Sequence, residues 1–207
     1  MADNKRSNNI LRALVAIYPH AKCELNYSSD FELLVAVILS AQCTDKRVNL
    51  VTSELFKVAN TPTKMLELGE AALSKIIYPC GFYAVKAKNI IATSKDLLDK
   101  HKAVVPNDFE ALIALKGVGR KTANVVLGEL FNTGGVAVDT HVFRVSRRLG
   151  LATGKNPHEV EKQLTALFKN QTRQAHHALI FHGRYCCKSQ RPNCNDCGVK
   201  EYCTILK

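Results

Sequence analysis

The stretch Leu115–Val126, "LKGVGRKTANVV", decides the predicted fold. Gly117 and Gly119 flank Val118, and the basic pair Arg120–Lys121 follows directly. Glycines at this spacing permit a tight turn and a close approach of another backbone, and the unpaired N–H groups at the start of the next helix attract anions. The sequence therefore predicts a helix–turn–helix corner that binds phosphate, with Val118 pointing inward. A plain turn, with glycines used for geometry alone, is the alternative.

Helical periodicity extends from this corner along nearly the whole chain. Ahead of it, Pro106 breaks the chain, and Asn107 with Glu110 three residues later fits a capping box for a helix over 108–115. After it, apolar residues at helical spacing predict a helix that is stopped by Gly134–Gly135. Few strands or none are expected, so the fold class is all-α. Further helices are expected over 31–41, 46–58, 83–99 and 173–185, and after Pro62 and Pro157.

The composition indicates a globular protein that binds a polyanion. Of the 207 residues, 46% are hydrophobic, which is enough for one large core or two small ones. The 29 Lys and Arg residues outnumber the 18 Asp and Glu residues, and the resulting formal charge of +11 favours nucleic acid. A generally basic surface is the alternative, but the basic residues gather in groups. These are Lys116, Arg120 and Lys121; Arg144, Arg147 and Arg148; and Arg184, Lys188 and Arg191.

The sequence suggests neither a membrane segment nor a secretory signal. The apolar run Leu33–Leu39 is far too short to span a bilayer. The first ten residues, "MADNKRSNNI", are polar and lack the apolar centre of a signal peptide. We therefore expect a cytoplasmic protein with no membrane association, in a compartment where thiols stay reduced.

Lys121 and Asp139 are the candidate catalytic residues. Lys121 stands in the first turn of a helix beside Arg120, where positive potential favours the neutral, nucleophilic form of an amine. A simple phosphate contact is the competing interpretation. Asp139 stands where the next helix needs an N-cap. A carboxylate in basic surroundings could also stabilise positive charge on a sugar or move a proton, and a cap alone is again the alternative.

Five of the eight cysteines lie within residues 186–203, here called the cysteine segment, and this clustering predicts a metal site. Disulfides are the alternative, although they are rare in a reducing compartment. Zinc and an iron–sulfur cluster both accept four cysteines, and the single Cys-x2-Cys pair favours the larger cluster. Cys186 competes with its neighbour as a ligand, and Cys23, Cys43 and Cys80 are expected to be buried thiols. The four candidate ligands are Cys187, Cys194, Cys197 and Cys203.

The segments "LSAQCTD", "LKGVGRKTANVV", "AVDTHVFRVSRRLGL" and "HGRY", together with the cysteine spacing, resemble the endonuclease III family of helix–hairpin–helix DNA glycosylases with lyase activity. The resemblance covers almost the full length. It implies two helical domains flanking a DNA-binding cleft. Residues 22–132 would form a six-helix barrel with the hairpin near 108–127, and residues 1–21 with 133–207 would form a domain holding a 4Fe–4S cluster on the four cysteines.

The resemblance also implies an activity in base excision repair. The substrate would be duplex DNA with an oxidised pyrimidine or an abasic site, bound by a monomer associated with the nucleoid. Lys121 would attack the sugar C1′, expel the base and form a Schiff base, and β-elimination would then cut the strand 3′ to the lesion. Asp139 would stabilise the cationic sugar. Gln42 would fill the space of the extruded nucleotide, and Phe82 would wedge the other strand. The remaining DNA contacts would be Gly117, Val118, Gly119, Arg120, Thr140, His141, Arg144, Arg184, Lys188 and Arg191.

Three residues depart from the family pattern: Lys116 stands where proline is frequent, Ile113 where a relative carries an acid, and Cys186 beside a ligand. Other interpretations also remain. A glycosylase without lyase action would not carry Lys121. A DNA-binding module with a structural metal would form no covalent adduct with an abasic site. A basic electron carrier would have a cluster that cycles readily without DNA.

Overall fold

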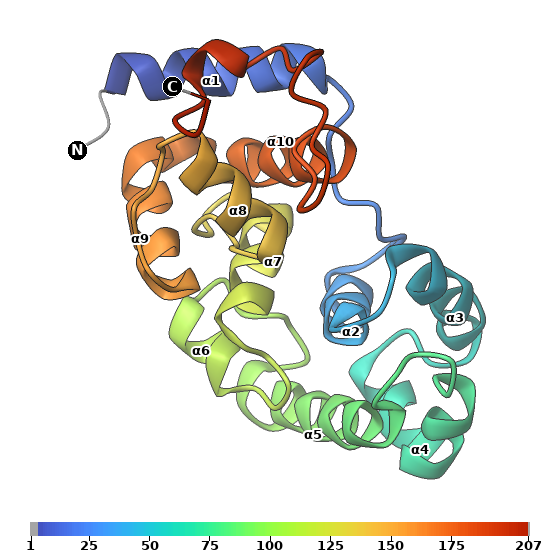
Figure 1. Cartoon of the computed structure of the whole chain (residues 1–207). Coiled ribbons are helices and arrows are strands. Elements are labelled where there is room, and N and C mark those ends of the chain that lie inside the picture. Colours follow the sequence, from blue (N-terminus) through green and yellow to red (C-terminus); the bar gives the residue numbers. More distant parts are fainter. Residues whose placement is uncertain (1–3, 207) are drawn as a thin grey trace. The chain divides into compact units, whose positions relative to one another are not determined.

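The computed structural model describes residues 4–206, and within that range it contains helices and no strand (Figure 1). The prediction of an all-α fold is therefore confirmed. None of these helices has the length and apolar character needed to cross a bilayer. The α-helices are α1 (Asn4–Ile17), α2 (Asp30–Ser40), α3 (Asp45–Val58), α4 (Pro62–Ile76), α5 (Tyr83–His101), α6 (Phe109–Ala114), α7 (Arg120–Leu130), α8 (Thr140–Arg148), α9 (Pro157–Phe168) and α10 (Thr172–Tyr185). The 3-10 helices are η1 (Lys169–Gln171) and η2 (Lys200–Tyr202).

The chain folds into two compact units. The hairpin unit is Glu24–Phe131 and contains α2 to α7. The cysteine unit combines the described residues 4–23 with 132–206, so that α1 joins the C-terminal helices and the cysteine segment. Each unit has buried apolar side chains of its own.

Helix α2 is the centre of the hairpin unit. It packs against α3, α5 and α7, while α4 packs against α5 and α6 against α7. Every residue from Phe31 to Leu39 is buried, which explains why this segment shows no amphipathic period. The hydroxyl of Ser29 caps the helix by accepting a hydrogen bond from the Glu32 backbone N–H at 3.2 Å.

Helix α10 organises the cysteine unit, where it packs against α1, α8 and α9. Arg6 of α1 fastens the cysteine segment, because its guanidinium donates to the carbonyl oxygens of Tyr202 and Leu149, at 2.6 and 2.9 Å. The core is built from aliphatic side chains at helical spacing, against which Cys187 and Cys197 pack. Its largest contributors include Ile10, Leu14, Val142, Val145, Leu164 and Leu179.

Two predicted helix boundaries were wrong. Helix α6 begins at Phe109, and its cap is Asp108 instead of Asn107, because the Asp108 carboxylate accepts from the Ala111 backbone N–H at 2.7 Å. Helix α7 ends at Leu130, before the predicted Gly134–Gly135 stop. Asn132 takes the left-handed conformation, with φ of 56°, that commonly ends a helix.

Candidate functional site

The corner between α6 and α7 has the predicted hairpin geometry. Val118 is only 6% exposed, so its predicted inward direction is confirmed. The Val118 N–H donates to the carbonyl oxygen of Leu115 at 3.2 Å, which closes the turn. The hydroxyl of Thr93 on α5 donates to the carbonyl oxygen of Lys116 at 2.8 Å. The turn is therefore fixed from inside by an apolar side chain and from α5 by a hydrogen bond.

The two glycines of the hairpin serve different purposes. Gly117 has φ of +77°, and a Cβ there would lie 2.9 Å from the Cβ of Asn89, so this position requires glycine for the fold. Gly119 is the N-cap of α7, without a side chain to accept from the first N–H groups, and a Cβ there would meet no atom within 4 Å. The helix start is thus open to solvent and to a phosphate oxygen.

Arg120 and Lys121 project from the first turn of α7, and both are exposed. The Arg120 guanidinium carbon lies 4.6 Å from the ring centroid of Phe109, so the α6 ring supports it. Within residues 4–206, the structure shows no hydrogen bond or ion pair at the Lys121 ammonium. The lysine is therefore presented to a ligand beside the open helix start.

Two exposed loop residues of the hairpin unit, Gln42 and Phe82, adopt left-handed backbone angles. Their φ values are 53° and 58°, and Phe82 is 65% exposed. Non-glycine residues rarely occupy this region, and those that do are concentrated at functional sites. Both residues are predicted DNA contacts, and their backbone strain is a signal that the sequence does not carry.

Asp139 is the N-cap of α8, as predicted. Its Oδ1 accepts a hydrogen bond from the Val142 backbone N–H at 2.8 Å. The next residue, Thr140, is exposed. His141 is half-buried, and its Nδ1 lies 3.2 Å from a terminal nitrogen of Arg144. The cap and its flanking residues thus expose polar groups at the start of a basic helix.

Two arginines of α8 hold the cysteine segment. Arg144 donates to the carbonyl oxygens of Cys187 at 3.0 Å and Gly183 at 2.9 Å. Arg148 donates to the carbonyl oxygen of Lys188 at 2.8 Å, and to the Sγ of Cys187 at 3.5 Å. The sequence placed both in one basic group expected to favour nucleic acid, because charge alone does not reveal that a guanidinium donates to backbone carbonyls of the same chain.

The other predicted contacts of this unit differ in exposure. Arg184, in the last turn of α10, is half-buried, whereas Lys188 and Arg191 of the cysteine segment are exposed. Arg191 also has a left-handed backbone, with φ of 48°. Lys188 and Arg191 are therefore the cations of this segment that a phosphate reaches most easily.

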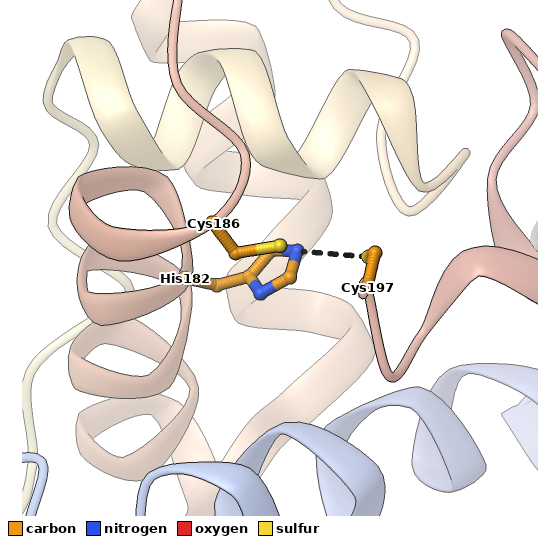
Figure 2. A group of neighbouring side chains, drawn as sticks. All are labelled: His182, Cys186 and Cys197. Carbon is orange, nitrogen blue, oxygen red and sulfur yellow. Dashed lines mark hydrogen bonds between the residues drawn. The ribbon is translucent and has the colours of Figure 1, made fainter. Parts of the chain in front are cut away.

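The cysteine segment encloses a pocket beside α10. Figure 2 shows His182 of α10 with Cys186 and Cys197 around it, and the distance from His182 Nε2 to Cys197 Sγ is 3.7 Å. Among the described residues 4–206, these three bring potential metal-binding atoms within 4.8 Å of one another. The pocket lining includes the four predicted ligands Cys187, Cys194, Cys197 and Cys203, together with Cys186, His182 and Arg148.

The electrostatics of this pocket suit a metal centre. Burial, together with the neighbouring thiols of Cys197, Cys187 and Cys194, raises the pKa of the Cys186 thiol to about 12. Burial lowers the pKa of His182 to about 4, so its imidazole is neutral at physiological pH. Crowded thiols that disfavour one another's negative charge are stabilised by a cationic occupant.

The donor set fits a 4Fe–4S cluster, which requires four cysteine thiolates. The pocket supplies these four at the predicted spacing and offers Cys186 as a fifth thiol. His182 was missed by the sequence reasoning. Its hydrogen bond to the hydroxyl of Tyr18, 3.2 Å from His182 Nδ1, fixes the ring in the pocket wall.

Comparisons with known proteins agree with this geometry. The family described as HhH-GPD superfamily base excision DNA repair protein matches residues 35–170. Endonuclease III of Rickettsia conorii is 54% identical, over 95% of this chain and 94% of its own length. Endonuclease III of Escherichia coli is 49% identical, over 94% and 92%.

Solved structures show the same similarity. A trapped endonuclease III–DNA covalent intermediate, an estranged-adenine complex, has a TM-score of 0.92 and 42% identity, and the match covers 99% of this chain and 97% of that one. A thermostable thymine-DNA glycosylase shares the fold, with a TM-score of 0.88, at 18% identity and with coverage of 99% and 98%.

Proposed function

Because the chain belongs to the HhH-GPD superfamily of base excision DNA repair proteins, and within it to the endonuclease III family, we propose that Lys121 and Asp139 carry its reaction. The protein is a bifunctional DNA glycosylase and AP lyase. Its substrate, in this proposal, is duplex DNA that contains an oxidised pyrimidine or an abasic site. We further propose that it works as a monomer in the cytoplasm, like a bacterial repair enzyme acting on the nucleoid.

The open start of α7 carries the proposal. Backbone N–H groups without a side-chain cap, the bare Cα of Gly119 and the exposed Arg120 suit a DNA phosphate. A phosphate held there brings its nucleotide close to Lys121, which follows Arg120 directly. Contacts of this kind read no sequence, as a repair enzyme that searches for lesions requires.

Lys121 acts as the nucleophile. Its neutral Nζ attacks C1′ of the extruded nucleotide, and the bond from C1′ to the base breaks with its electron pair leaving on the base, which takes up a proton. The attacking nitrogen then loses one proton, and the bond from C1′ to O4′ breaks with its electron pair leaving on O4′, which takes up a proton. Nζ and C1′ are now joined as an iminium ion, the protonated Schiff base. Removal of a proton from C2′ then expels the 3′ phosphate and cuts the strand. The relative trapped as a covalent intermediate with DNA supports this route.

Asp139 supports this chemistry with its negative charge. As the cap of α8 it is held in one orientation by the Val142 N–H, which suits a carboxylate that must stabilise a positive sugar. The same group can receive a proton from the attacking amine. The cap therefore positions the carboxylate and does not compete with its catalytic task.

The remaining predicted DNA contacts fall into three groups according to their place in the structure. Gln42 and Phe82, both left-handed and exposed, are the proposed residues that enter the duplex. Arg144 donates to the carbonyl oxygens of Cys187 in the cysteine segment and of Gly183 in α10, so its contribution to DNA binding is indirect in this proposal. The direct phosphate contacts are then Gly117, Val118, Gly119, Arg120, Thr140, His141, Arg184, Lys188 and Arg191.

Cys187, Cys194, Cys197 and Cys203 hold the 4Fe–4S cluster in this proposal. The cluster, when bound, supplies a redox-active centre and four covalent links within one short segment. The chain's own residues already fix that segment from outside, through Arg6, Arg144 and Arg148. The segment then presents Lys188 and Arg191 to the phosphate backbone.

A Lys121→Gln variant tests the proposal by separating binding from cleavage. We expect strand cleavage to be abolished while affinity for an abasic-site duplex largely survives, because one charge among many phosphate contacts only trims binding. Gel-shift and strand-cleavage assays on duplexes with one defined lesion each give both values. Cleavage by the variant at the wild-type rate would refute the assignment of Lys121.

A further inference from the structure

Cys43 and Cys80 meet at the base of two loops in the hairpin unit. Cys43 follows α2 and is half-buried, whereas Cys80 precedes α5 and is completely buried. The chain segments that carry them are joined through Arg47, whose backbone N–H donates to the Thr44 hydroxyl beside Cys43 and whose guanidinium donates to the carbonyl oxygen of Pro79 beside Cys80. The Cys43 thiol also raises the pKa of Cys80. Both cysteines are free, and neither belongs to the pocket of the cysteine unit.

Each of the two loops that meet at this thiol pair carries a non-glycine residue with left-handed backbone angles. Gln42 directly precedes Cys43, and Phe82 follows Cys80 by two residues. Two cationic side chains donate hydrogen bonds to backbone carbonyls of these loops and so restrain them. Lys86 donates to the carbonyl oxygens at the end of α2, and Arg47 of α3 donates to the carbonyl oxygen preceding Cys80, at 3.4 Å.

We propose that Cys43 and Cys80 are a reversible thiol–disulfide site that covalently joins the Gln42 loop to the Phe82 loop. Solvent reaches Cys43 first, because Cys80 is fully buried. Cys43 is therefore the attacking thiol and Cys80 the resolving one. Disulfides in a reducing compartment are characteristically transient and regulatory, which matches a pair at a functional loop.

The oxidant is a low-molecular-weight disulfide. The Cys43 thiolate attacks one of its sulfurs, forms a mixed disulfide and releases the first small thiolate. The Cys80 thiolate then attacks the Sγ of Cys43, forms the intramolecular disulfide and releases the second. Two cysteine thiols lose two electrons, the small disulfide gains them, and the two cysteine protons go to the released thiolates. An external dithiol reverses the sequence.

The expected effect of the disulfide on DNA cleavage rests on the proposed function. Entry of Gln42 and Phe82 into a duplex requires both loops to adjust, and a covalent bond at their base restricts that adjustment. Small misplacements of positioning residues are costly in enzymes, so we expect the oxidised protein to cleave abasic-site DNA at least about tenfold more slowly. Reduction restores the rate.

The bond itself is tested without DNA. The holoenzyme is incubated with glutathione disulfide, its remaining thiols are alkylated, and visible absorbance is followed to confirm that the cluster stays intact. Digestion with trypsin and a Glu-specific protease isolates Cys43 on fragment 33–46 and Cys80 on fragment 76–86, and separates Cys23 from both. Mass spectrometry should find these two fragments linked, and dithiothreitol should separate them.

Matched variants decide between outcomes. Cys80→Ala should leave glutathione on Cys43 with no linked fragment, Cys43→Ala should leave Cys80 unmodified, and Cys23→Ala should behave as wild type. Glutathione retained on Cys43 in the wild type, without a linked fragment, would overturn the site. Failure of Cys43 to react would overturn it as well.

A cleavage assay on the same samples tests the effect on the loops. Wild type should cleave more slowly after oxidation and recover with dithiothreitol. Cys80→Ala in its reduced state should cleave at the normal rate, and because it cannot form the disulfide it should not show the slowing that the disulfide causes. A linked wild type that cleaves at the full rate would overturn the control of the loops. Absence of cleavage by the fully reduced wild type would instead contradict the proposed function, and the linked fragment would still report on the disulfide.

Discussion

The ammonium group of Lys86 lies 2.8 Å from the carbonyl oxygen of Ala41 and 2.9 Å from that of Leu39. One buried cation therefore closes the C-terminal end of α2, where the helix dipole is negative and carbonyls lack partners within the helix. Lys86 belongs to α5, which begins directly after Phe82. The same side chain thus connects the loop that carries Gln42 to the helix that carries Phe82.

Replacing Lys86 by methionine should destabilise the hairpin unit. The substitution keeps most of the apolar stem but leaves two carbonyl oxygens without their donor, which costs about 2 kcal/mol. Chemical denaturation followed by circular dichroism gives the free energy of unfolding. Lys88→Met is the matched control, because Lys88 is exposed on the same helix, and it should change stability very little. Equal losses in both variants would contradict the contact.

The two hairpin glycines should respond in opposite ways to alanine. Gly117→Ala places a Cβ against Asn89 at a left-handed position and should cost about 2 kcal/mol of stability. Gly119→Ala meets open space, so it should fold normally but bind duplex DNA more weakly, because its methyl group lies where the phosphate approaches. Unfolding curves and gel shifts separate the two effects. A Gly119→Ala variant with wild-type affinity would argue against phosphate binding there.

Much of this hairpin was predictable from the sequence. Two glycines around an apolar residue, followed by a basic pair, require a turn and an open helix start, and both are present. The sequence could not show which glycine is required for the fold and which leaves space, because that depends on Asn89, which lies on α5 far along the chain. The helix ends were wrong for the same reason, since local capping signals compete and packing selects one.

Asparagine and alanine substitutions of Asp139 separate the cap from the charge. An asparagine side chain would still accept from the Val142 N–H, so Asp139→Asn should keep the stability of α8 while base release slows. Asp139→Ala should slow base release and in addition cost about 1 kcal/mol of stability. Single-turnover base release and thermal melting measure the two quantities. Unfolding of the asparagine variant would show that the charge serves the fold and not the reaction.

Formation of the proposed disulfide should accelerate with pH. Burial and the Cys43 thiol raise the pKa of the Cys80 thiol, Lys86 of α5 and Arg47 of α3 lower it, and the net pKa is about 11. Only the thiolate attacks, so the conversion of the mixed disulfide to the linked form should speed up by about tenfold for each pH unit below that value. Quenched samples between about pH 7 and pH 9 supply the rates. A rate that stays constant over this range would exclude Cys80 as the resolving thiol.

The cysteine and arginine groups show where sequence reasoning stops. The spacing of the C-terminal cysteines predicted a metal pocket, and the four thiols line one pocket. Arg144 was predicted as a DNA contact and Arg148 as a member of the same basic group, yet both donate to carbonyls of the cysteine segment. Cys43 and Cys80 were expected to be ordinary buried thiols. The two cysteines lie on loops that are distant in sequence, so no local sequence pattern predicts that these loops meet.

Borohydride trapping tests the central claim, that Lys121 attacks the sugar, most directly. Sodium borohydride reduces a Schiff base to a stable amine, so wild-type protein incubated with abasic-site duplex should give a covalent protein–DNA adduct that denaturing electrophoresis resolves. Lys121→Ala should give none while it still binds the duplex, and peptide mapping should locate the wild-type adduct on Lys121. An undiminished adduct in Lys121→Ala, or no adduct in the wild type, would contradict the account.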